Sequence, residues 1–447
     1  MLQPVISTIN HGTYLTGPLE KAFKEVFPPD YVLFGGNKNS EGVSVKAAVT
    51  TTTRQSRVVV LSNYNRKSPK IPLNHFHRPG PEKEMMLWEA ARATSAAPSY
   101  FRPFAHTASE QVYLDGGIYH NSPILVADVE SKAIWPSSRD RQPDIILSVG
   151  TGIDPRKETA VDTSVAVEAL VSSVGSDLPI DRDRRSYLEV LMRLGYDHLI
   201  NGLDSERAWN EWLQIKAPDP RNERRYRRLN VRFKGPVRMD KFDDIKKCRD
   251  AVTEQIDDTE ILKIADQLIS SCFYFHFEQE EIRELRNGGY DCTGRISCRL
   301  FGDSLQKLGA HLEKLSGPPK PGHFRPSFVI REIRPNRKRT RKLLEIKPDW
   351  PKTMRGEKKF AMDVPLVLIS SERAETEILL KLRPDQEDKD LFPISGFPRR
   401  LQDDHKVILQ ERWGSQLIPH KLATKLNRST TLSRVLTGGI RERDDSN

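Results

Sequence analysis

The sequence has few cysteines, and none of them is arranged as a metal-binding or disulfide motif. Four cysteines in 447 residues are too few for a disulfide scaffold. No Cys-x-x-Cys pair occurs, so the spacing gives no zinc site. We therefore expect no metal and no cofactor, and a reducing, cytoplasmic compartment. The four positions are Cys248, Cys272, Cys292 and Cys298.

Long apolar runs are missing as well. No stretch approaches the roughly 20 apolar residues that a membrane-spanning helix needs. The longest runs, such as Val364–Ser370, have the length of a strand. The first 12 residues lack the basic and apolar regions of a secretory signal. Any contact with a membrane is therefore expected to be peripheral.

The first 300 residues lack an excess of either charge. The whole chain carries 71 Lys+Arg against 61 Asp+Glu, a net charge of +10. Residues 301–447 hold 30 basic and 20 acidic residues, which accounts for that entire excess. The basic character therefore belongs to the C-terminal third. A hydrophobic content of 37% supports a packed core, and the length allows two or three domains.

The first half of the chain alternates between predicted strands and helices. Apolar residues at helical spacing predict a helix from Leu19 to Phe27. Residues 43–53 and 58–64 are apolar or β-branched throughout, which is typical of strands buried on both faces. Helices are predicted over 82–94 and 121–134, and strands over 112–117 and 143–152. This alternation indicates an α/β layer.

The second half is predicted to be mixed. Residues 157–235 are predicted to be helical, with Tyr187, Val190, Leu191 and Leu194 on one face. A helix over 256–270, strands over 272–277 and 292–300, and a linker over 316–326 follow. The runs FVIREI, VPLVLIS and EILLKL predict strands. We expect domains at 1–235, 236–315 and 327–400, and a tail at 401–447.

The most specific segment is 89–152. It contains EAARATSAAPSYFRPF, then YLDGGIYHNSP, then PDIILSVGTG. Together with VKAAVTTTTRQSRVVVLSNYNR before it and RYRRLN after it, this segment resembles the C-terminal half of a patatin-like phospholipase (lipid acyl hydrolase) domain. The likeness is greatest to the fungal forms, and it extends over roughly residues 10–300.

The resemblance implies a fold, a reaction and a site. The fold would be α/β: a partial patatin-like three-layer α/β/α domain, then an α+β extension and a small, basic, β-rich C-terminal module. The reaction would be hydrolysis of acyl esters in lipids or phospholipids by a Ser–Asp dyad, without a metal. Asp115 would hold the position of the dyad base, with Gly116 and Gly117 completing the Asp-Gly-Gly motif.

The sequence departs from the family pattern at the nucleophile. None of the 447 residues forms a Gly-x-Ser-x-Gly elbow or an Asp-Gly-Gly-Gly-x-x-Gly oxyanion turn. We therefore expect an N-terminally truncated member of a serine carboxylic-ester hydrolase family, inactive as given. The alternative is a non-catalytic lipid- or protein-binding pseudoenzyme with a basic tethering module.

Other residues near the motif have simpler interpretations. His120 is interpreted as a loop histidine before a capping Asn121, since the family's dyad uses no histidine. Ser95 and Ser122 are interpreted as a helix-end residue and a cap. Gly150 and Gly152 are expected to shape the turn after a strand.

Two further segments leave alternatives open. The FYFHF run at 273–277 is predicted to be a core strand in preference to a membrane patch. The basic cluster 331–342 fits a solvated face first, then anionic phospholipid. Nucleic acid comes last, because no nucleic-acid domain motif accompanies the cluster.

Overall fold

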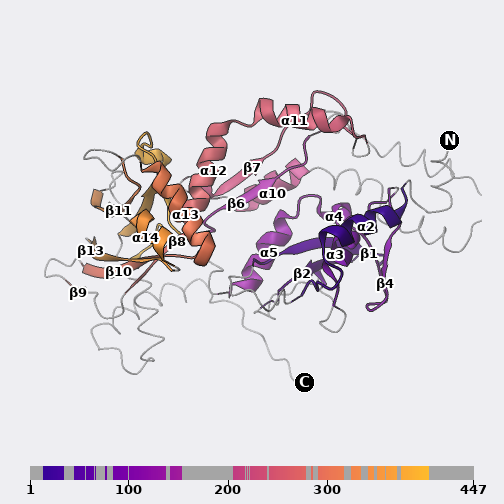
Figure 1. Cartoon of the computed structure of the whole chain (residues 1–447), viewed down its shortest axis with the longest axis horizontal. Coiled ribbons are helices and arrows are strands. Elements are labelled where there is room, and N and C mark those ends of the chain that lie inside the picture. Colours follow the sequence, from indigo (N-terminus) through magenta and orange to yellow (C-terminus); the bar gives the residue numbers. More distant parts are fainter. Residues whose placement is uncertain are drawn as a thin grey trace, which may run out of the picture. The chain divides into compact units, whose positions relative to one another are not determined.

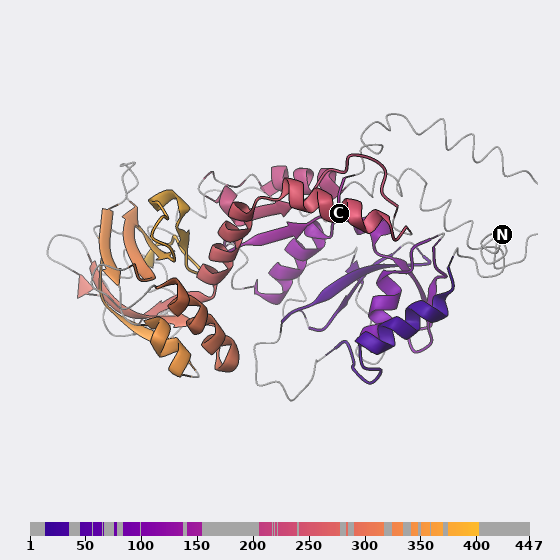
Figure 2. The same ribbon diagram turned by 45° about the horizontal axis from the view of Figure 1, so that its top comes forward.

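The structure is a computed structural model, and the chain divides into two compact units, residues 1–261 and 262–447. Each unit is described by itself (Figures 1 and 2). No helix in the described ranges is long and apolar enough to cross a membrane. The structure describes residues 14–34, 45–55, 57–64, 66, 76–77, 84–98, 100–136, 141–153, 205–216, 218, 220, 222–238, 241–277, 283–284, 290–316, 324–333, 341–346, 350–357, 359–369 and 374–401.

Unit 1 contains a five-stranded sheet with the order β3-β2-β1-β5-β4. The pairs β1–β2, β1–β5 and β4–β5 are antiparallel, and β2–β3 is parallel. The strands are β1 (Ala48–Thr53), β2 (Val58–Ser62), β3 (Phe76–His77), β4 (Phe104–His106) and β5 (Gln111–Asp115).

Helices cover both faces of this sheet. Along β2, Val59 and Leu61 pack with Ala90 and Ala93, which lie on α3. Val60, between them, packs with Val126 of α5 on the opposite face. Since side chains alternate between faces along a strand, a run buried on both sides must be apolar throughout. This confirms the prediction for β2 and gives three layers. The helices are α2 (Thr16–Val26), α3 (Leu87–Thr94), α4 (Gly117–His120) and α5 (Ile124–Ile134).

The rest of unit 1 is built around a second, smaller sheet. β6 (Ile146–Val149) and β7 (Tyr226–Leu229) pair in parallel. Trp209 and Trp212 of α10 (Ser205–Lys216) are buried against Ile124 of α5. A short 3-10 helix, η3 (Glu223–Arg225), precedes β7, and α11 (Asp244–Gln255) follows it.

Unit 2 contains two four-stranded sheets. In the first, β13-β10-β8 lie in order and β9 also pairs with β10; the second has the order β12-β11-β14-β15. The strands are β8 (Phe273–Phe277), β9 (Arg283–Glu284), β10 (Tyr290–Cys298), β11 (Ser327–Ile333), β12 (Arg341–Ile346), β13 (Ala361–Ile369), β14 (Glu375–Lys381) and β15 (Phe392–Pro393). The helices are α12 (Asp258–Ser271), α13 (Gly302–Leu315), α14 (Trp350–Gly356) and η4 (Asp388–Asp390).

Aromatic side chains form the core of unit 2. Phe273 is fully buried, and its ring meets those of Phe328, Trp350 and Phe360 edge to face, with centroids 5.3–6.0 Å apart. The interpretation of FYFHF as a core strand is thereby confirmed for Phe273 and Phe275. A network of buried polar groups lies nearby, in which Asp266 pairs with Arg383 at 2.7 Å and accepts a hydrogen bond from Gln386.

Most of the predicted elements are present. The helix from Leu19, the strand 112–117 and the helix ending at 134 correspond to α2, β5 and α5, and the strands of the C-terminal third correspond to β11, β13 and β14. α11 and α13 were not predicted. β13 pairs with β10, so strands from either side of the 316–326 segment share a sheet. The five-part domain division stays a prediction.

Some predictions fall outside the described residues. These are the helical face at Tyr187–Leu194, residues 334–340 of the basic cluster, and the tail after 401. Within the cluster, Arg331 is described. It is buried and pairs with Asp388, so the interpretation as a solvated face is wrong for this residue.

Candidate active site

Asp115 is the last residue of β5, where the strand leaves the sheet. Its partner across the β1–β5 pair is Thr51. The Asp115 N–H donates to the carbonyl of Ala96 at 3.1 Å, and the Gly116 N–H donates to the carbonyl of Thr94 at 3.4 Å. The backbone around the carboxyl group is therefore held by the end of α3 as well as by the sheet.

The Asp115 carboxylate is fixed by its own motif. Its Oδ1 accepts a hydrogen bond from the Gly117 N–H at 2.6 Å. Burial raises the pKa of Asp115 above its usual range, and the bond from Gly117 acts in the opposite direction. A carboxylate whose pKa lies closer to the working pH is a better general base. No other hydrogen bond to this carboxylate is formed within the described part of the chain.

Space is tight around both glycines of the motif, and only at Gly116 is the close neighbour a backbone atom. A Cβ on Gly116 would lie 2.1 Å from the carbonyl oxygen of Thr50, and a Cβ on Gly117 would lie 2.9 Å from the Asp115 Oδ1. Gly116 has ordinary helical dihedral angles, φ −68° and ψ −25°. Close approach of the motif to β1, and not an unusual backbone conformation, therefore excludes a side chain at Gly116.

Threonine side chains of β1 and α3 also hold the backbone near Asp115. Thr51 Oγ1 donates to the carbonyl of Leu114 at 2.6 Å, and Thr94 Oγ1 donates to the carbonyl of Thr50 at 2.6 Å. Sequence reasoning took the Thr50–Thr53 run only as a strand signal and missed this role. The run of four threonines beside a predicted Asp-Gly-Gly strand was the available signal.

The structure resolves the interpretations of the neighbouring polar residues. Ser95 Oγ donates to the carbonyl of Ala91 at 2.6 Å, which confirms a helix-end residue. His120 was expected in a loop, but it ends the short helix α4, and burial lowers its pKa. The capping interpretations of Asn121 and Ser122 are wrong. Asn121 has helical dihedral angles, and the residue before α5 is Pro123, without any side-chain capping bond.

One constellation was missed entirely. Ser109 Oγ lies 2.8 Å from His106 Nδ1, and His106 Nε2 lies 3.5 Å from Glu89 Oε2, which resembles a hydrolase triad. Ser109 is only 3% exposed, however, and also contacts the Tyr113 hydroxyl. A nucleophile must reach its substrate, so we interpret this chain of contacts as a lock on the β4–β5 hairpin.

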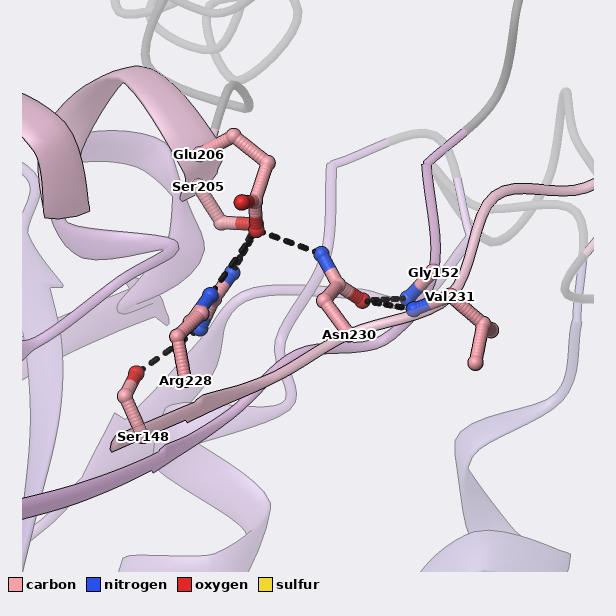
Figure 3. Close-up of polar contacts among 7 residues, drawn as sticks. All are labelled: Ser148, Gly152, Ser205, Glu206, Arg228, Asn230 and Val231. Carbon is pink, nitrogen blue, oxygen red and sulfur yellow. Dashed lines mark hydrogen bonds and ion pairs between the residues drawn. The ribbon is translucent and has the colours of Figure 1, made fainter. Parts of the chain in front are cut away.

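A second polar network joins β6 to β7 (Figure 3). Arg228 donates to Glu206 Oε1 at 2.8 Å and to Ser148 Oγ at 2.7 Å. Asn230 Oδ1 accepts the N–H groups of Gly152 at 2.8 Å and Val231 at 3.1 Å. Gly152 has φ +96°, which confirms that this glycine shapes the turn after β6. The network positions the turn after β6.

The described ranges contain no cluster of potential metal ligands. There, no group of three or more His, Cys, Asp or Glu side chains is placed to hold a metal ion. The described cysteines, Cys248, Cys272 and Cys298, are free thiols, and burial raises the pKa of Cys298 to about 12. The Cys298 thiol is therefore a poor nucleophile at neutral pH.

Comparison with known proteins supports the resemblance. Residues 3–128 match the family model described as patatin-like phospholipase. This range includes Asp115, Gly116 and Gly117. The predicted family resemblance is confirmed over this range, and the likeness to fungal forms stays a prediction.

The curated relatives are phospholipases. The chain is 33% identical over 109 residues to "Calcium-independent phospholipase A2-gamma" of Homo sapiens, covering 23% of this chain and 13% of that protein. It is 27% identical over 251 residues to "85/88 kDa calcium-independent phospholipase A2" of Mus musculus, covering 52% of this chain and 27% of that protein. The chain thus spans about a quarter or less of the length of these relatives. No solved structure matches it significantly.

Proposed function

We propose that this chain, which carries a match to the patatin-like phospholipase domain over residues 3–128, supplies the base half of a lipid acyl hydrolase site. Asp115 would deprotonate a serine hydroxyl, and the serine would attack the acyl carbonyl of a phospholipid or neutral lipid. The alcohol would leave as an acyl-enzyme forms. Asp115 would then activate the water that releases the fatty acid. By analogy with the printed names of the relatives, the reaction would not need calcium.

The observation that carries this proposal is the setting of the Asp115 carboxyl group. It stands at the end of β5, is held by the Gly117 N–H at 2.6 Å, and has a pKa raised by burial. A partly buried carboxylate with one fixed hydrogen bond keeps lone pairs available for a proton. A purely structural aspartate would normally be satisfied by several partners.

The nucleophile is the other half of the proposal. The 447 residues contain no Gly-x-Ser-x-Gly elbow, and Ser109, which contacts His106, is buried. We therefore assign the attacking serine to a segment outside these 447 residues. On this proposal the chain by itself does not turn over acyl esters.

The test is reconstitution. The chain is produced alone and fused behind a segment of a patatin-like phospholipase domain that carries the Gly-x-Ser-x-Gly elbow of the family. Fatty acid release from phosphatidylcholine is measured in the presence of a calcium chelator. We expect background release from the chain alone and hydrolysis by the fusion. Asp115→Asn in the fusion should lower turnover by about a thousandfold or more, as removal of an essential member of a catalytic unit does.

The matched control is Asp30→Asn, which neutralises an exposed aspartate of the same unit. It should leave turnover unchanged. Rapid, site-specific labelling of the isolated chain by a fluorophosphonate probe would show a reactive serine within the 447 residues and overturn the assignment. Full activity of the Asp115→Asn fusion would overturn the role of Asp115 as base.

The second candidate is a non-catalytic lipid- or protein-binding relative. It is favoured by the absent serine elbow in this sequence. Its basic C-terminal third would act as a tether. A fusion that stays inactive although it folds, together with retained binding of lipid by the chain alone, would favour this candidate over the hydrolase.

A further inference from the structure

Helix α11 has one face that packs into unit 1. Cys248 and Ala251 lie in a cluster with Val231 and Phe233, which follow β7. Asp244 is buried on the same side at the start of the helix. The helix is therefore fixed to the unit along this face.

Three large apolar side chains are exposed on α11 or just before it, among polar residues. Phe242 is 85% exposed, Ile245 44% and Val252 45%. Positions 245 and 252 of α11 lie on one side of a helix of 3.6 residues per turn, and Phe242 lies in the turn that precedes the helix. We call this set, with the flanking Lys246 and Arg249, the α11 stripe.

Phe242 is held outward by the turn that begins the helix. The Ile245 N–H donates to the Phe242 carbonyl at 3.0 Å. The buried Asp244 accepts hydrogen bonds from Lys247 Nζ at 2.7 Å and from the Arg238 N–H at 2.9 Å. These contacts keep the pKa of Asp244 below its usual range. The exposure of the Phe242 ring thus follows from an anchored turn.

The charges on the stripe have one sign. Lys246 and Arg249 are exposed between the apolar residues. Within the described ranges neither side chain has a carboxylate partner at ion-pair distance. Of the acidic side chains of α11, Asp244 lies on the buried face and Glu254 pairs with Lys234 at 2.6 Å, while Asp250 is exposed beside Arg249 and outside the stripe. Apolar side chains next to unpaired cations complement the headgroup region of an anionic bilayer.

We propose that the α11 stripe docks on an anionic lipid surface. Phe242, Ile245 and Val252 enter the boundary between headgroups and acyl chains, and Lys246 and Arg249 contact the lipid phosphates. The choice of a lipid surface over a protein partner rests in part on the proposed function. The docking itself requires no catalysis, and it is distinct from the basic cluster at 331–342.

The test uses sucrose-loaded vesicles of ether-linked lipids, which an acyl hydrolase cannot cleave. Co-sedimentation of the full chain is measured with phosphatidylcholine alone and with 30% phosphatidylserine added. We expect binding to the anionic vesicles that weakens as salt rises. Phe242→Ser should reduce the partition coefficient by about tenfold. The Lys246→Glu, Arg249→Glu double variant should reduce it by about tenfold or more.

The matched control is Ile215→Ser, which removes a 79% exposed apolar side chain from α10 of the same unit. It should bind as the original chain does, and circular dichroism should show equal melting for all variants. Phe242→Ser that binds normally, or Ile215→Ser that loses as much, overturns the proposal. The proposal is also overturned if the α11 stripe is a protein interface. In that case the chain self-associates, Phe242→Ser abolishes the self-association, and vesicle binding persists. Because the vesicles are not hydrolysed, failure here leaves the reconstitution result untouched.

Discussion

Gly116→Ala tests the packing at the candidate site most directly. The added Cβ would lie 2.1 Å from the carbonyl oxygen of Thr50 and 2.4 Å from the Thr50 Oγ1. The carbonyl belongs to the backbone of β1 and cannot rotate away as a flexible side chain could. Either the turn after β5 or the strand itself must move.

The expected loss of stability depends on which atom the added Cβ would contact. Overpacking of a closely packed site costs about 1–3 kcal/mol, and a rigid backbone neighbour places Gly116→Ala near the upper value, at about 3 kcal/mol. For a unit of this size that corresponds to a fall in Tm of about 6–12 °C. The φ of −68° suits alanine, so no gain or loss comes from the dihedral angle.

Two other glycines provide a graded comparison. A Cβ on Gly117 would meet only the Asp115 Oδ1, at 2.9 Å, and that oxygen can move. Gly117→Ala should therefore cost less than about 1 kcal/mol, while displacing the carboxylate. Gly17 in α2 has no atom within 4 Å of its Cβ position, so Gly17→Ala should stabilise by up to about 1 kcal/mol.

Differential scanning calorimetry is the assay, because it separates transitions when two units unfold independently. The expected order of Tm is Gly17→Ala highest, then the original chain, Gly117→Ala and Gly116→Ala. If Gly116→Ala melts within about 1 °C of the original chain, the close approach of the motif to β1 is not present in solution. The packing of the Asp-Gly-Gly motif against β1, as described for the candidate site, would then be wrong.

Two further predictions concern single side chains. Because burial raises the pKa of Asp115 in the folded chain, the folded state binds the proton more tightly, and ionising the group lowers stability as pH rises. Asp115→Asn should therefore resist urea better than the original chain at pH 7, and the advantage should shrink toward the ordinary aspartate value of 3.8. Arg228→Gln should cost about 1–3 kcal/mol in urea unfolding, because Glu206 and Ser148 lose their cation. Lys234→Gln, which breaks only the exposed pair with Glu254, should change stability by less than about 0.5 kcal/mol; equal losses would contradict the structural importance of the β6–β7 network.

The order of elements around the site could be predicted from local patterns. Because β2 has a helix on each face, it requires consecutive apolar residues, and such a run can be recognised in the sequence. The Asp-Gly-Gly motif follows a short apolar strand and precedes a predicted helix, and the structure has β5, which ends at Asp115, followed by α5; the short α4 between them was not predicted. Such signals depend only on neighbours in the chain.

Contacts between distant segments could not be predicted in the same way. The pairing of β13 with β10 joins residues about 70 positions apart, and partner choice in a sheet depends on which faces are already buried. The contact of His106 with Glu89 requires the β4–β5 hairpin to fold over α3. The start of α11 was missed because its apolar positions are divided between two faces, one buried and one exposed.

The parallel pairing of β6 with β7 has a consequence for folding kinetics. The Ser148–Arg228 contact joins residues 80 positions apart. The chain must therefore lose the conformational entropy of closing a long loop before this pairing can stabilise the fold. Parallel, non-local strand pairs of this kind form late, after local helices and hairpins such as β4–β5. Contacts that form after the transition state affect mainly the unfolding rate. The hydrogen bonds of Arg228 and Asn230 are therefore expected to form late and to slow the unfolding of unit 1, with little effect on its folding rate.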